Sequence, residues 1–256
     1  KTHMGMADDD WFVCIHARDD VYHSQIRASG GKIHRVGDKS HRNADISTYL
    51  QAADRIGKAG GYALRVGWGV ERPLNVDNPR IIDYAIKHRS DFGDVFVSGQ
   101  CRFFVASGAG LMAVPVAFGV PVILTNILPP RLWPLRSHSM VLPKLLRDLD
   151  SGELVPFSRL NDLGVFTYDF NKAMEWDEPT KYSAHNLVPV DNSSEDIAAA
   201  CDDMLGILEG RPVPLEAQEV QEIYKRKYCT TTLDAIKHGP NLVPSFAIKN
   251  ANVIVN

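Results

Sequence analysis

The chain has 256 residues, 45% of them hydrophobic and 23% charged, and a formal net charge of −3 at pH 7. This length and composition are ordinary for a soluble globular protein with one large α/β domain or two small ones. The slight negative charge gives no general attraction to nucleic acid or to anionic membranes, so a phosphate site has to be built locally. No apolar run approaches the ~20 residues that cross a bilayer, and no signal-peptide pattern opens the sequence. We therefore expect neither a nucleic-acid partner nor a transmembrane segment.

The cysteines indicate the cellular compartment, and the first residues set the expected start of the domain. The cysteines lie far apart and form no C-x-x-C pair; they are Cys14, Cys101, Cys201 and Cys229. Two of them fall in apolar, strand-like runs, so we expect buried reduced thiols, which suit a cytoplasmic protein. Residues 1–10 are interpreted as a leader or tag remnant outside the fold, and residues 11–256 as a single α/β domain.

The first third of the chain alternates apolar runs with charged segments. Trp11–His16 and Tyr62–Val66 are predicted strands, and apolar residues at helical spacing predict a helix over Ile46–Ile56. Val21–Arg42 is rich in His, Lys, Arg and Ser and shows little periodicity, so we predict a long loop there. Asn78–Lys87 is predicted as a short helix with Pro79 in its first turn.

The middle of the chain contains the most apolar run. Ser90–Ser98 is either a strand or a short helix. Arg102–Ala106 reads as a strand buried on both faces, because it is short, aromatic and β-branched. The later predictions are a helix over Leu111–Phe118, a strand over Val122–Leu124, a proline-rich loop over Leu128–Leu135, a strand over Ser139–Leu142, a helix over Phe157–Leu163, a strand over Leu187–Val190, a helix capped by Ser193 that runs to Leu208, and a helix over Leu215–Tyr228.

Strands that alternate with helices are typical of a parallel sheet covered on both faces. We see no internal repeat and no clear domain boundary. The predicted fold is therefore a Rossmann-like α/β domain.

A glycine-rich turn joins the central strand to the helix that follows. Ser107, Gly108, Ala109 and Gly110 have almost no side-chain bulk, and the turn directs backbone N–H groups and the positive end of a helix at one place. Such a place binds anions. The alternative is a glycine turn needed only for packing.

Arginines stand next to predicted strand ends. Arg18 follows the first strand, Arg65 ends the second, and Arg42 precedes the first helix. Because the carboxyl ends of parallel strands share one edge of a sheet, these guanidinium groups and the turn are expected to form a diphosphate site. The alternative for each arginine alone is a solvated surface charge.

Other chemistries fit the sequence less well. The turn also spells G-x-G-x-x-A, but the following strand ends in Thr125-Asn126 without the acidic residue that a dinucleotide site needs. No Walker loop and no G-x-S-x-G elbow occurs. Histidine and aspartate crowd the segment after the first strand without metal-ligand spacing, so we expect no metal site. These residues are His23, His34, His41, Asp19, Asp20, Asp38 and Asp45.

Eight short motifs together resemble a family of bacterial glycosyltransferases. They occur in that family's order and extend over most of the chain; they are His16–Asp19, Arg42–Ile46, Arg65–Gly67, Ser90–Phe92, Arg102–Gly110, Pro121–Asn126, Pro143–Lys144 and Asn192–Ile197. The pattern is more distantly similar to the nucleotide-binding half of the fucosyltransferases, which have an acid sixteen residues before a serine turn, as Asp91 stands before Ser107. In place of their second arginine this sequence has Asp19.

The resemblance implies a GT-B type, metal-independent transfer from a nucleoside-diphosphate sugar, with no other cofactor. Arg18 would hold the β-phosphate, His16 would orient the site, and Asp91 would read the base. The other expected donor-binding residues are Arg42, Asn43, Arg65, Gly67, Ser107, Gly108, Ala109 and Gly110.

The expected reaction needs a group that stabilises the leaving diphosphate and a base that takes the acceptor's proton. Arg18 would stabilise the leaving diphosphate, and Asp19 or Asp20 would take the acceptor's proton. Two alternatives remain: a non-catalytic nucleotide-sugar-binding module, and an epimerase or hydrolase that acts on the donor alone. The acceptor and a possible homo-oligomer are left open.

Overall fold

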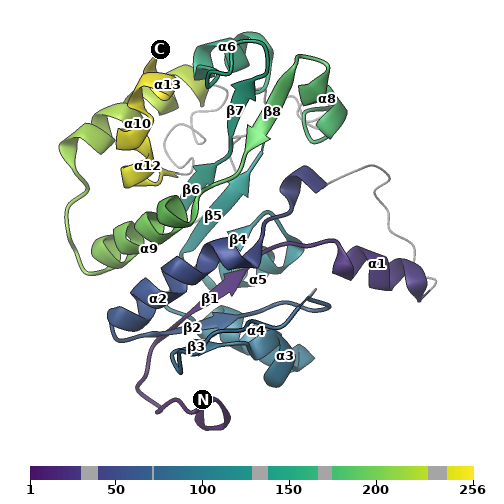
Figure 1. Cartoon of the computed structure of the whole chain (residues 1–256). Helices are drawn as coiled ribbons and strands as arrows, with labels where there is room; N and C mark the ends of the chain where they lie inside the picture. Colours follow the sequence, from purple (N-terminus) through teal and green to yellow (C-terminus); the bar gives the residue numbers. More distant parts are fainter. Residues whose placement is uncertain (30–39, 71, 129–137, 167–174, 230–240) are drawn as a thin grey trace.

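The computed structural model describes residues 1–29, 40–70, 72–128, 138–166, 175–229 and 241–256, and its centre is a parallel sheet (Figure 1). Seven strands pair in the order β3-β2-β1-β4-β5-β6-β9, every neighbour parallel. They are β1 (Phe12–His16), β2 (Tyr62–Arg65), β3 (Ile81–Ile82), β4 (Phe104–Ser107), β5 (Val122–Ile127), β6 (Met140–Pro143) and β9 (Asn241–Leu242). The Rossmann-like fold is confirmed.

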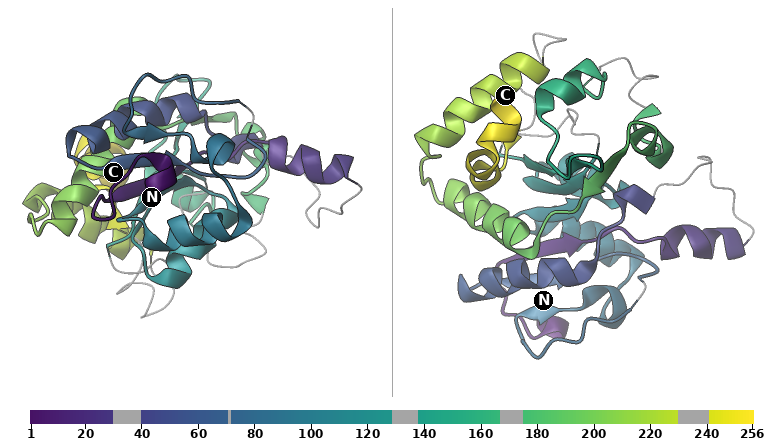
Figure 2. Two further views of the ribbon diagram at one scale, coloured as in Figure 1. Left: turned by 90° about the horizontal axis from the view of Figure 1, so that it is seen from below. Right: turned by 45° about the horizontal axis from the view of Figure 1, so that its top comes forward.

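Helices cover both faces of this sheet. Helices α2 (Leu50–Lys58) and α9 (Ser194–Leu208) pack side by side on one face, and α4 (Asp91–Gln100) and α5 (Ala113–Phe118) pack together on the other. The view from below in Figure 2 shows the strands between these two layers. The other helices are α1 (Val21–Ala28), α3 (Tyr84–Lys87), α6 (Phe157–Asp162), α8 (Pro179–Ser183), α10 (Leu215–Tyr228), α12 (Pro244–Lys249) and α13 (Ala251–Val255), with 3₁₀ turns at Thr2–Met4, Ser40–Arg42, Ile46–Tyr49 and Gly110–Met112.

The central strands are apolar because both of their faces are covered. Strands β4 and β5 are buried along their whole length, as the run of aromatic and β-branched residues predicted. All four cysteines are buried free thiols, which confirms that expectation. In the part of the chain that the structure describes, no helix combines the length and apolar character needed to cross a membrane.

A capping residue explains the conformation of Ser90–Ser98, for which the sequence allowed either a strand or a short helix. Ser90 is the N-cap of α4, and its Oγ accepts a hydrogen bond from the backbone N–H of Gly93 at 3.0 Å. Asp91 and Asp94 lie in the first turn, where the helix dipole favours acids. This segment is therefore a helix. Ser193 caps α9 in the same way, as predicted.

Four predictions about the elements are wrong. The segment after β1 is not a loop throughout, because Val21–Ala28 forms helix α1; residues 30–39 lie outside the described residues, as does most of the proline-rich loop. Only Tyr84–Lys87 of the predicted helix after Asn78 is helical, because Ile81–Ile82 pairs with β2 as an edge strand. The first residues are not outside the fold, because Met6 is buried against the core.

The fourth correction concerns a second sheet. The predicted strand β8 (Leu187–Val190) does not join the parallel sheet but pairs antiparallel with β7 (Leu145–Asp148), which the sequence analysis missed. In Figure 1 this pair lies beyond β5 and β6, next to α8. Arg147 and Leu154 extend it by an isolated bridge. The pair contributes one wall of the site described below.

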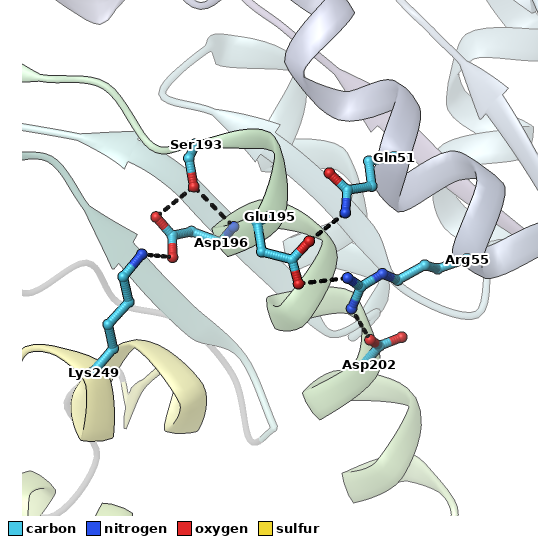
Figure 3. A network of polar contacts seen from close by, with 7 residues as sticks. All are labelled: Gln51, Arg55, Ser193, Glu195, Asp196, Asp202 and Lys249. Carbon is cyan, nitrogen blue, oxygen red and sulfur yellow. Dashed lines mark hydrogen bonds and ion pairs between the residues drawn. The ribbon is translucent and has the colours of Figure 1, made fainter.

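Polar contacts hold the helices of one face together (Figure 3). Arg55 on α2 reaches across to α9, where it pairs with Glu195 at 2.6 Å and with Asp202. Lys249 on α12 pairs with Asp196 at 2.6 Å. These contacts join segments that lie up to 147 residues apart in the chain. They join α2 to α9 and α9 to α12 on this face of the sheet.

Candidate functional site

The site lies where the chain direction across the sheet reverses. The chain leaves β1 toward β2 on one side and leaves β4 toward β5 on the other, so the carboxyl ends of β1 and β4 form a crevice. Ligands of open α/β sheets bind at this switch point. The backbone N–H of Arg18, after β1, donates to Oγ of Ser107, at the end of β4, at 2.7 Å. The two predicted motifs therefore meet.

Two cavities open on either side of Arg18. The larger has a volume of about 880 Å³ and lies between the segment after β1, the segment before α2, and the α8–β8 region. The smaller, of about 320 Å³, lies between the ends of β1 and β2, the glycine turn and α4. Ala17, Arg18 and Asp19 line both cavities. A molecule that occupies both cavities would lie next to these three residues.

The guanidinium of Arg18 is held in place by its neighbours. It donates through Nη1 to the side-chain oxygen of Asn43, whose amide nitrogen donates to Asp20 at 2.8 Å. Arg18 is 8% exposed. Burial, and then the positive charge of Arg42, lowers the pKa of Arg18. Two guanidinium groups so close together, with little water around one of them, favour a bound anion.

Arg42 lies against the glycine turn. A Cβ atom at Gly108 would stand 3.7 Å from a guanidinium nitrogen of Arg42 and 3.2 Å from Cδ1 of Ile127, so this position leaves little room for a side chain. Ser107 and Gly108 are buried, whereas Ala109 and Gly110 line the smaller cavity. Only the second half of the predicted turn therefore faces a cavity.

Arg65 lines the larger cavity together with Arg18, as predicted, but it is already paired. Its Nη1 donates to Asp83 at 2.9 Å, and its Nη2 donates to the backbone carbonyl of Arg72 at 3.2 Å. Arg65 and Asp83 are 5% and 4% exposed. Arg65 therefore positions the end of β2, and its pairing with Asp83 was not predicted.

His16 lies in the wall of the smaller cavity. Its Nδ1 is 3.0 Å from the carbonyl of Val66, which favours a proton on that nitrogen. Burial lowers the pKa of His16, so the imidazole is neutral at pH 7. Gly67 adjoins it with φ 141°, and a Cβ there would stand 3.0 Å from the ring. Close packing against His16 and this backbone conformation require the glycine.

The acidic residue predicted to read the base is not in either cavity. The side chain of Asp91 is 93% exposed and pairs with Arg89 at 2.5 Å. Asp94, one turn further along α4, lines the smaller cavity instead. Its Oδ2 pairs with Arg89 at 3.0 Å, its buried Oδ1 has no hydrogen-bond partner among the described residues, and burial raises its pKa. The helical spacing from Asp91 was the signal that could have pointed to Asp94.

The predicted catalytic acids already have partners. Asp19 accepts a hydrogen bond from the backbone N–H of Val21 at 3.1 Å, at the start of α1, and Asp20 accepts from Asn43. Lys144, which the sequence analysis assigned no role, lines the larger cavity with a side chain that is 3% exposed. Its Nζ bonds Asp191 at 2.5 Å. Its position directly after β6, at the same sheet edge, was the available signal.

Comparison of the chain with protein-family models and with curated proteins gives no match. Among the described residues, no group of three or more His, Cys, Asp and Glu side chains is arranged to hold a metal ion. The functional assignment therefore depends on the geometry of the switch point.

Proposed function

We propose that the protein binds a nucleoside-diphosphate sugar across the switch point and transfers its sugar to an acceptor. The observation that carries this proposal is the place of Arg18, between two cavities at the carboxyl edge of the sheet. A nucleoside-diphosphate sugar has its charge in the middle and a neutral group at each end. Arg18, with Arg42 beside it, matches the charged middle of such a molecule.

The two cavities suggest the direction of the donor. The sugar end has to share its space with an acceptor, so we assign it to the cavity of about 880 Å³. The base then enters the cavity of about 320 Å³, whose wall includes Trp68, 44% exposed. An aromatic face stacks on a base, and the carboxylate of Asp94 accepts hydrogen bonds from its N–H groups.

Bond cleavage places growing negative charge on the diphosphate. Arg18 is positioned before the reaction and stabilises that charge without rearranging, and the nearby charge of Arg42, which lines neither cavity, adds to the positive field. Loss of one such donor typically costs ~2.7–4 kcal/mol of transition-state stabilisation. This electrostatic contribution is the main catalytic effect that we assign to the residues at the switch point.

A nucleotide panel tests the proposal. Melting temperatures are measured with GDP, UDP, dTDP, ADP and CMP, and one diphosphate at 100 times its dissociation constant should stabilise the protein by ~2.7 kcal/mol. Consumption of the corresponding nucleotide sugar is then followed with and without simple sugar acceptors. Turnover that needs an acceptor supports a transferase. Binding without turnover leaves a binding module, acceptor-free conversion indicates an epimerase or hydrolase, and no binding contradicts the proposal.

Base reading by Asp94 gives a prediction with a matched control. Asp94→Asn should weaken binding of the preferred nucleotide about ten- to a hundredfold, because a hydrogen bond to a charged group contributes ~1.5–3 kcal/mol. Asp91→Asn removes a carboxylate that also pairs with Arg89 but faces solvent, so its affinity should match the unmodified protein. Calorimetric titration measures both. Equal losses in the two variants would assign the effect to Arg89 rather than to the base.

A further inference from the structure

A buried histidine lies in the wall of the larger cavity with a buried aspartate next to it, and neither has a role assigned so far. The side chain of His41 is 3% exposed and that of Asp177 is 1% exposed, and Nε2 of His41 stands 3.4 Å from Oδ1 of Asp177. His41 lines the cavity. Neither of its ring nitrogens has a hydrogen-bond partner among the described residues. Because buried polar groups are nearly always bonded, this imidazole is suited to bond a molecule in the cavity.

The charges around His41 favour one tautomer. The carboxylate of Asp177 faces Nε2 and attracts the proton to that nitrogen, which leaves the lone pair on Nδ1. Arg42 lies 3.7 Å from the same carboxylate oxygen, so a positive charge faces this carboxylate as well. On the other sides, the ring of Tyr182 on α8 is 6.3 Å away, and Lys144 and Arg18 line the same cavity. A carboxylate behind an imidazole also stabilises the imidazolium that forms when the ring takes a proton.

We propose that His41, supported by Asp177, is the base that accepts the proton of the attacking hydroxyl group. This inference rests on the proposed function. The acceptor's O–H bond breaks, its proton passes to Nδ1 of His41, and its oxygen forms the new bond to the anomeric carbon. The bond from that carbon to the β-phosphate oxygen breaks, and its electron pair leaves with the diphosphate next to Arg18. His41 replaces Asp19 and Asp20 in this role, because both acids are held by other contacts.

The experiment compares turnover with donor binding. In His41→Gln, consumption of the donor that the nucleotide panel identifies should fall about 10²–10⁴-fold, the usual contribution of a general base. The thermal shift caused by the nucleoside diphosphate should stay as in the unmodified protein. The rise of the rate with pH that reflects deprotonation of the base should also disappear. A purely structural role would change melting and binding but not the shape of the pH profile.

Two further variants control for folding and for charge. His88→Gln changes the histidine that caps the C-terminus of α3 and lines neither of these cavities, and it should keep the full rate. Asp177→Asn should lower the rate and shift the pH profile, because the imidazolium loses its carboxylate. Turnover that survives His41→Gln, or a pH profile unchanged by it, overturns the inference and leaves the proposed function standing. Absence of any turnover in the unmodified protein overturns the proposed function, and the inference with it.

Discussion

Replacing Arg18 with alanine should abolish the thermal stabilisation by a nucleoside diphosphate and lower donor turnover about 10²–10³-fold. The reason is that this side chain lies between the two cavities and supplies paired N–H donors where the diphosphate charge would lie. Arg18→Lys should recover only part of the binding, because an ammonium keeps the charge without the planar pair of donors. Melting curves with and without nucleotide measure the first effect, and single-turnover kinetics measure the second.

A matched control separates a lost contact from a lost positive charge. Arg226→Ala changes an exposed arginine in the last turn of α10 that lines neither of these cavities, so it should leave binding and turnover unchanged. Equal nucleotide stabilisation in Arg18→Ala and in the unmodified protein would contradict the assignment of the diphosphate to the switch point. Equal nucleotide affinity in Arg18→Ala and Arg226→Ala would also contradict that assignment, even if the turnover of Arg18→Ala fell.

Replacing Asp83 with alanine should destabilise the fold by ~3–5 kcal/mol, because it leaves the buried guanidinium of Arg65 without its carboxylate. Asp83 also accepts a hydrogen bond from the backbone N–H of Leu74 at 2.8 Å, so the loop after β2 loses an anchor. With ~2–4 °C per kcal/mol, the melting temperature should fall by about 6–20 °C. Denaturant unfolding provides the free energy directly.

The double replacement Arg65→Met with Asp83→Leu tests the cause of that loss. Removing both charges leaves no buried ion alone, so the double variant should be more stable than Asp83→Ala. Its nucleotide affinity should stay close to that of the unmodified protein, because we assign Arg65 to positioning and not to the diphosphate. A double variant that is as unstable as the single one would mean that the Leu74 contact, and not the ion pair, carries the effect.

Much of the site followed from the order of strands along the sequence. Arg18 and the glycine turn each follow a predicted strand, and Arg42 precedes a predicted helix. The apolar residues of these elements are close together in the sequence, so the elements were predicted correctly and their polar neighbours were placed at one edge of the sheet. Lys144 follows the predicted strand Ser139–Leu142 by two residues, but it was not assigned to the site. Asp91 was the wrong carboxylate of its helix, because the sequence did not decide between strand and helix and hence did not show which side chains share a face.

The sequence by itself determined the central strands, the capped helix α9, the buried cysteines and the edge of the sheet where the site lies. These depend on periodicity, capping and chain order, which are properties of neighbouring residues. Only the tertiary structure decided that Arg65 forms an ion pair with Asp83, that His41 lies against Asp177, and that β8 pairs with β7 rather than with the large sheet. Such contacts join residues that are 18 to 136 positions apart, and their energy comes from burial that exists only once the chain has folded.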